Sequence, residues 1–132
     1  MTDKQTIFNS EAIRIPTPDG TLNVFIMENA DGIPFEIQVV IGKSGSALAA
    51  WANTAAALCS MLLQTNACKL ADLAQLLQSQ NGDKTHYTDS REPVRSGPDG
   101  LALAFIKYQN GKFAKIRETL GIKDVDSIDI ED

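Results

Sequence analysis

The chain has 132 residues, 43% of them hydrophobic and 22% charged, which is typical of one globular domain and excludes an intrinsically disordered protein. Its formal net charge is −5, but residues 123–132 hold five acidic residues and one lysine and so carry −4, which leaves −1 for residues 1–122. Such a nearly neutral domain lacks the dense positive field that general nucleic-acid binding requires.

The organisation along the chain is that of a single domain between two polar ends. Residues 1–10 are mixed in charge, without a basic segment followed by an apolar core, so we expect no secretory signal peptide. We predict an N-terminal extension over 1–10, one domain over 11–121 and an acidic C-terminal tail over 122–132. Acidic and apolar residues alternate in the tail, which suits either a solubilising tail or a segment that docks on a partner.

Three short runs predict the strands of a small sheet. They cover about 11–16, 22–27 and 35–41, and in the last two an apolar residue recurs at every second position. Thr17-Pro18-Asp19-Gly20 and Asn29-Ala30-Asp31-Gly32 separate the runs, and both are turn sequences because their glycines accept left-handed backbone. We therefore predict an α+β fold with a three-stranded antiparallel meander, one face of which must be covered.

An alanine-rich segment, about 47–64, predicts the long helix that covers this face. Asn53, Ser60 and Gln64 form one narrow polar stripe, so we expect the other sides of the helix to be buried. Trp51 is expected in the core, or alternatively as an anchor between two helices. The segment is shorter than the roughly 20 apolar residues of a membrane span. Because one small sheet cannot cover the whole helix, we expect a homodimer.

Shorter helices are predicted after the long one. Leucine and alanine side chains share one face of the segment 70–78. Residues 79–97 show no periodicity and are predicted to form a long loop. Two further helices are predicted over 98–109 and 113–120, separated by Asn110-Gly111, with Gly121 ending the second.

Cysteine and histidine usage argues against a metal or cofactor site. Cys59 and Cys68 are nine residues apart, which is a poor spacing for a metal pair or a redox CxxC motif. With His86 as the single histidine, they do not make a metal-ligand set, and we predict no cofactor. Unbridged cysteines suit a reducing compartment, so a cytoplasmic location is expected.

Three segments carry a resemblance to a known family: Arg14–Leu22 (RIPTPDGTL), Asp31–Glu36 (DGIPFE) and Ile41–Ser46 (IGKSGS). Over roughly residues 12–107 the chain resembles the TSCPD domain. That domain occurs near the C-terminus of adenosylcobalamin-dependent class II ribonucleotide reductases and in small free-standing proteins. The reductase chemistry requires a large barrel that 132 residues cannot contain, so the resemblance implies no reductase activity.

The chain departs from the family at its cysteines. The family is named for a Thr-Ser-Cys-Pro-Asp segment, and the matching stretch Arg95–Asp99 keeps the serine, proline and aspartate but has Gly97 in place of the cysteine. Short members also carry a cysteine where this chain has Ser44, and another shortly before the named segment, where residues 81–94 contain none. A thiol-based redox or metal role of a relative is therefore not expected here.

A glycine-rich turn, Gly42-Lys43-Ser44-Gly45-Ser46, leads from the third strand into the long helix. Free amides at a helix N-terminus beside a lysine favour an anion. A nucleotide-hydrolysing P-loop is excluded because that pattern requires glycine at position 37, which is Ile37. The turn is thus either a structural turn with a serine cap or a site for phosphate or carboxylate.

Further candidate ligand contacts lie near the predicted third helix. Arg91 and Arg95 belong to the long loop and could close over an anion held at the glycine turn. Ser96 and Asp99 flank the helix start, where they can cap the helix, contact a ligand or do both. His86 lies in the same loop without a nucleophile beside it in the sequence, and a solvated role is expected.

These patterns predict a binding module rather than an enzyme. The leading prediction is a small anionic ligand, such as a nucleotide, bound at the glycine turn. The alternative is a protein that docks onto a ribonucleotide reductase or a related nucleotide-metabolism enzyme, using the long helix or the acidic tail. Membranes and nucleic acids are not expected as partners.

Overall fold

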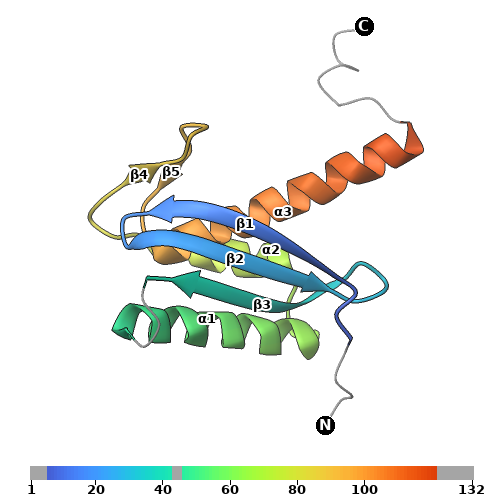
Figure 1. Cartoon of the computed structure of the whole chain (residues 1–132), viewed down its shortest axis with the longest axis horizontal. Coiled ribbons are helices and arrows are strands. Elements are labelled where there is room, and N and C mark those ends of the chain that lie inside the picture. The colour runs from blue at the N-terminus through green and yellow to red at the C-terminus, as the bar shows by residue number, and fades with distance from the viewer. Residues whose placement is uncertain (1–5, 43–45, 122–132) are drawn as a thin grey trace, which may run out of the picture.

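The computed structural model describes residues 6–42 and 46–121 and has the predicted α+β fold (Figure 1). Strands β1 (Asn9–Thr17), β2 (Gly20–Glu28) and β3 (Pro34–Ile41) form an antiparallel sheet in the order β1-β2-β3. The predicted meander is confirmed, and each strand is somewhat longer than expected. The acidic tail lies outside the described residues.

Strand register places the alternating apolar residues on one face. Val24 of β2 pairs with Ile13 of β1 and with Val39 of β3, and Leu22 pairs with Ile15 and Ile41. Because side chains alternate between the faces of a strand, these residues all point to the same side of the sheet. That side of the sheet faces the hydrophobic core.

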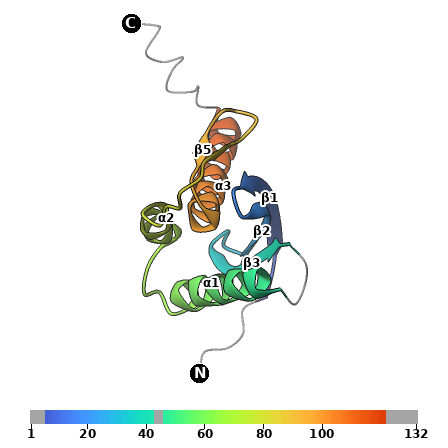
Figure 2. The same cartoon turned by 90° about the vertical axis from the view of Figure 1, so that its left-hand side faces the viewer.

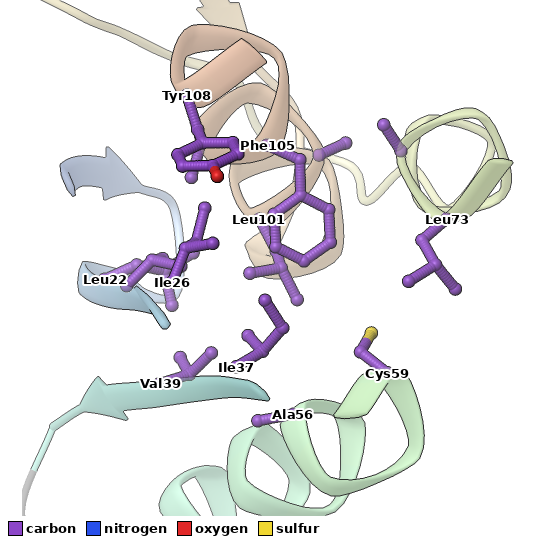
Figure 3. Close-up of a cluster of buried hydrophobic side chains, with 14 of the residues drawn as sticks. Leu22, Ile26, Ile37, Val39, Ala56, Cys59, Leu73, Leu101, Phe105 and Tyr108 are labelled. Atoms are coloured by element: carbon purple, nitrogen blue, oxygen red, sulfur yellow. The ribbon is translucent and has the colours of Figure 1, made fainter. Parts of the chain in front are cut away.

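Three helices surround the sheet: α1 (Ala47–Gln64), α2 (Leu70–Gln78) and α3 (Gly97–Leu120). Seen end-on, α3 lies over the inner face of the sheet with α2 packed beside it, whereas α1 runs along the free edge of β3 (Figure 2). Leu101 and Phe105 of α3 meet Ile37 of β3, and Cys59 of α1 closes the core from below (Figure 3). The predicted bounds of α1 and α2 are confirmed.

The third helix corrects one prediction, because α3 is a single helix and Asn110-Gly111 does not interrupt it. A glycine inside a helix costs about 1 kcal/mol relative to alanine. That cost is offset by contacts on either side, since Tyr108 is buried in the core and Lys112 donates a hydrogen bond to the carbonyl oxygen of Gly32 at 2.7 Å. Gly121 ends the helix in a left-handed conformation, φ 72°, as predicted.

Residues 79–97 are not a structureless loop. They contain a short hairpin of β4 (His86–Tyr87) and β5 (Pro93–Val94), closed by Arg91 at φ 62°. Val94 is fully buried and anchors the hairpin to the core. Strands of two residues are too short to produce a periodic pattern, so no alternation of side chains predicts them.

The orientation of α1 corrects a second prediction. Ser60, expected on a polar stripe facing solvent, is buried and binds the edge of β3. Its hydroxyl accepts from the amide of Ile37 at 2.8 Å, and its single proton is shared between the carbonyl oxygens of Ala56 at 2.9 Å and Ile37 at 3.2 Å. Gln64 donates to the carbonyl of Phe35 at 3.0 Å. The helix lies against the backbone of an edge strand, so Ser60 and Gln64 contact β3 while Asn53 stays exposed, and much of the apolar surface of the helix faces out.

Candidate functional site

A cavity of about 110 Å³ lies at the end of the sheet where β1 turns into β2. Its walls come from the β1–β2 turn, strands β2 and β3, the first turns of α1, the end of α2 and the start of α3. The lining residues are Asp19, Leu22, Val39, Ile41, Leu48, Trp51, Ala52, Ala55, Leu77, Gly97, Pro98 and Leu101. All but Asp19 and Gly97 present apolar side chains, so the cavity suits an apolar group.

Asp19 connects the β1–β2 turn to the N-terminus of α3. Its carboxylate oxygen Oδ2 accepts a hydrogen bond from the amide of Gly97 at 2.9 Å. The turn itself is held by Thr17, whose hydroxyl accepts from the amide of Asp19 at 3.1 Å and donates to the carbonyl of Gly20 at 2.7 Å. A Cβ at position 97 would lie 3.1 Å from Asp19 Oδ2, so the two segments approach more closely than most side chains allow.

Ser96 and Asp99, both candidate ligand contacts, form the N-terminal cap of α3. The Ser96 hydroxyl accepts from the amide of Asp99 at 3.0 Å and donates to the carbonyl of Gln80. The Asp99 carboxylate accepts from the amide of Arg95 at 2.9 Å. Both side chains are buried, and their oxygens already hold backbone groups. The capping role expected of them is present.

The structure does not bring the two candidate arginines to the cavity. Arg91 lies at the exposed tip of the β4–β5 hairpin, and Arg95 is exposed between β5 and α3. Neither lines the cavity. His86 is exposed in β4. The grouping of these residues with the glycine turn stays a prediction.

The glycine turn is described at its two ends, while Lys43, Ser44 and Gly45 lie outside the described residues. Gly42 has φ 62°, a left-handed conformation that favours glycine. Ser46 caps α1, since its hydroxyl accepts from the amide of Ala49 at 3.1 Å. Leu48, in the first turn of α1, lines the cavity. The N-terminus of α1 therefore lies beside the cavity.

Trp51 corrects a third prediction, because it is 75% exposed and does not belong to the core. It lines the cavity from α1, one turn after the cap. The packing of α1 along β3 directs Trp51 outward, and no periodicity in the sequence distinguishes that orientation from a buried one. An exposed indole beside an apolar cavity is well placed to contact a bound molecule.

Several lining residues were not predicted as site residues, among them Asp19, Leu48 and Pro98. One signal could have found two of them, since Asp19 and Pro98 lie in segments that resemble the family. Among the described residues, no group of three or more histidine, cysteine, aspartate or glutamate side chains could hold a metal ion.

A second polar centre lies at the opposite end of the sheet, around the buried Glu28. Its carboxylate forms an ion pair with Lys112 at 2.7 Å, accepts from Asn9 at 3.2 Å and accepts from the hydroxyl of Tyr108. Burial alone would raise the pKa of Glu28, but these hydrogen bonds favour the charged form and the pKa is lowered. Burial and the neighbouring carboxylate raise the pKa of Tyr108. Every partner belongs to the fold, so this centre is structural.

Comparison with known proteins gives one match. The family model of the TSCPD domain matches residues 3–109. No curated protein and no solved structure matches the chain. The matched range includes β1 to β5, α1, α2 and the first half of α3, and so contains every wall of the cavity.

Proposed function

The chain belongs to the TSCPD domain family, and from this premise we propose that it is a non-catalytic binding module that holds a small anionic ligand, such as a nucleotide, at the N-terminus of α1. The observation that carries the proposal is the cavity. Three segments that are distant in the sequence meet there: the Asp19 turn, the start of α1 after the glycine turn, and the Gly97–Pro98 start of α3.

The shape and lining of the cavity favour a flat apolar group. A dry apolar cavity of about 150 Å³ is known to accept benzene, so about 110 Å³ with an open mouth suits part of a ring system. Trp51 at the mouth offers a stacking surface of the kind that binds bases, at about 1–3 kcal/mol per base. The carboxylate of Asp19 can accept from an amino group on the ring.

The anionic part of the ligand is expected at the glycine turn. The amides of Ala49 and Ala50 are bound by Ser46, which leaves the amides before them as donors at the start of α1. A phosphate at this position is favoured by the helix dipole and by Lys43 in the adjacent sequence. A nucleoside monophosphate combines both requirements.

The side chains support binding rather than catalysis. Ser46 and Ser96 use their hydroxyls to cap helices. Burial raises the pKa of the Cys59 thiol to about 11, so this residue is protonated at neutral pH and a poor nucleophile. The exposed His86 is not among the cavity residues.

The single tryptophan makes the proposal directly testable. Trp51 emission is measured while the protein is titrated, at fixed protein concentration, with adenosine monophosphate, adenosine and inorganic phosphate. We expect saturable quenching by the monophosphate, weaker binding of the nucleoside and little response to phosphate alone. The proposal would be contradicted if emission showed no saturable change up to millimolar nucleotide and calorimetry detected no heat of binding.

Two site variants and one control variant test the location of the site. Ala55→Leu places additional carbons into the cavity and is expected to weaken binding at least about tenfold, which corresponds to about 1.4 kcal/mol. Ala114→Leu adds the same atoms to an exposed position of α3 and should bind as the wild type does. Lys43→Ala tests the anionic contact and should affect the monophosphate more than the nucleoside.

A second candidate function, docking on a nucleotide-metabolism enzyme such as a ribonucleotide reductase, is favoured by the second half of α3. Phe113, Ile116 and Leu120 are exposed there, and the first two line a groove with Pro34 and Leu70. Binding to a purified class II reductase should be lost in Ile116→Glu and kept in Ala114→Glu. If both variants bound the reductase equally well, this surface would be excluded as the docking site. A chain ending at Gly121 tests separately whether the acidic tail contributes to binding.

A further inference from the structure

The outward side of α1 presents an apolar seam with the spacing of a helix–helix contact. Ala47, Trp51, Thr54, Leu58 and Met61 follow one another at alternating intervals of four and three residues. The buried residues of the helix, which include Ala49, Ala56, Cys59 and Leu63, lie on the opposite side. The seam is therefore a continuous surface that residues 6–42 and 46–121 leave uncovered.

The seam combines large exposed apolar side chains with an absence of charged residues in α1. Three large apolar side chains of the seam are mostly exposed: Trp51 is 75% exposed, Leu58 56% and Met61 63%. The helix contains no Asp, Glu, Lys or Arg in its 18 residues. Monomeric soluble proteins rarely leave so continuous an apolar surface in water. Cores of homodimer interfaces are poor in charged residues and rich in tryptophan and methionine, as this surface is.

The large side chains are also arranged symmetrically along the helix. Trp51 and Leu58 lie equally far from the point between Thr54 and Ala55, and Leu48 and Met61 are equally far from the same point. A surface with this arrangement is complementary to itself when a second helix runs in the opposite direction. A two-fold axis requires this property, because each copy then contributes the same patch.

We propose that the protein forms a two-fold symmetric dimer through α1, with the two helices antiparallel and the axis passing beside Thr54 and Ala55. Trp51 of each copy then packs against Leu58 of the other. The proposal does not depend on a ligand. It does place the second copy beside the cavity, because Leu48 and Trp51 belong both to the cavity wall and to the outward side of α1.

The main competitor for this surface is a lipid bilayer. Among the described residues, α1 is long and apolar enough to cross a membrane by length and composition. Its inner side, however, binds β3 through Ser60 and Gln64, and the polar side chains of Glu36 and Gln38 line the groove beside it. Crossing a bilayer would require breaking these contacts and burying the charge of Glu36, so the second copy is the better occupant.

A matched pair of exposed leucines tests the dimer. Sedimentation equilibrium of the wild type is expected to give twice the chain mass. Leu58→Glu places a carboxylate in the centre of the interface and should weaken association by at least about 100-fold. Leu76→Glu makes the same change on α2, at a side chain that is 61% exposed and outside the seam, and should remain dimeric.

Cross-linking tests the position of the axis. A cysteine in Thr54→Cys, made in a Cys68→Ser background, should form a disulfide with its counterpart, because residues beside a two-fold axis meet themselves. Ala71→Cys on α2 should not. A monomeric wild type at near-millimolar concentration, or a Leu58→Glu variant that still dimerises, would overturn the proposal. So would binding of the wild type to phosphatidylcholine vesicles in place of self-association.

Discussion

The hydroxyl of Tyr108 donates a hydrogen bond to the carboxylate of Glu28, which lies eighty positions earlier in the chain. Lys112 pairs with the same carboxylate at 2.7 Å, and its ammonium lies 5.9 Å from the centre of the Tyr108 ring. One buried charge thus fixes the end of β2 to the middle of α3. Removing the carboxylate leaves the buried Tyr108 hydroxyl without the acceptor that it has in this structure.

This arrangement predicts a specific response to acid. The pKa of Glu28 is lowered from its ordinary value of 4.5, so the unfolded state binds more protons than the folded state as the pH falls below that value. The contribution of Glu28 is therefore present above about pH 4.5 and is lost as the pH falls through the folded pKa. In Glu28→Gln, the free energy of unfolding should be lower by about 1.5–3 kcal/mol at neutral pH and should fall less steeply in acid. Urea unfolding across the acid range measures both, and Glu36→Gln serves as the control.

Two glycines of α3 should respond in opposite directions to the same substitution. A Cβ at Gly100 would lie 2.5 Å from Thr17 Cγ2, and Thr17 is held in place by its hydrogen bonds in the β1–β2 turn. Gly100→Ala should therefore lower the free energy of unfolding by about 1–3 kcal/mol. No atom lies within 4 Å of a Cβ at Gly111, and Gly111→Ala should raise it by about 0.5–1 kcal/mol. Thermal unfolding distinguishes the two, and equal effects would contradict the close packing at Gly100.

Ser60 should be more important to stability than its size suggests. Ser60→Ala leaves the amide of Ile37 without its hydrogen-bond acceptor, at an expected cost of about 1–3 kcal/mol. Thr65→Ala removes an exposed hydroxyl that binds only the carbonyl oxygens of its own helix, and should change stability by less than about 0.5 kcal/mol. Amide hydrogen exchange at Ile37 should rise in the first variant alone.

The two cysteines should differ in reactivity. Burial raises the pKa of Cys59 to about 11, so almost none of it is thiolate near neutral pH, whereas Cys68 is partly exposed. A thiol reagent at about pH 8 should label one thiol in the folded chain and two in denaturant. Cys68→Ser should abolish labelling of the folded protein. Rapid labelling of that variant would mean that α1 separates readily from the core.

The elements that follow from local sequence could be predicted, and those set by distant contacts could not. The strands and the bounds of α1 and α2 appear in the alternation of side chains and in turn sequences. Gly111 was expected to end a helix because local propensity takes no account of Lys112, which reaches Gly32 at the far end of the sheet. A helix-breaking residue is tolerated where tertiary contacts hold both sides.

The candidate site shows the same division. The glycine turn and the start of α3 were identified from their sequences, and their serine caps formed as expected. The contact between Asp19 and Gly97 joins residues 78 positions apart, and no periodicity reveals such a pair. The apolar composition of α1 predicts a buried Trp51, but composition does not say which side of a helix an edge strand will occupy.

The position of α1 along β3 has a consequence for how this protein can misassemble. An edge strand offers unpaired amides and carbonyls that can recruit strands from other molecules and start fibrils. Here the hydroxyl of Ser60 and the side-chain amide of Gln64 occupy such groups at Ile37 and Phe35. Any agent that separates α1 from the sheet therefore exposes the unpaired backbone groups of β3 together with the apolar seam around Trp51. The protein should then aggregate rather than unfold gradually.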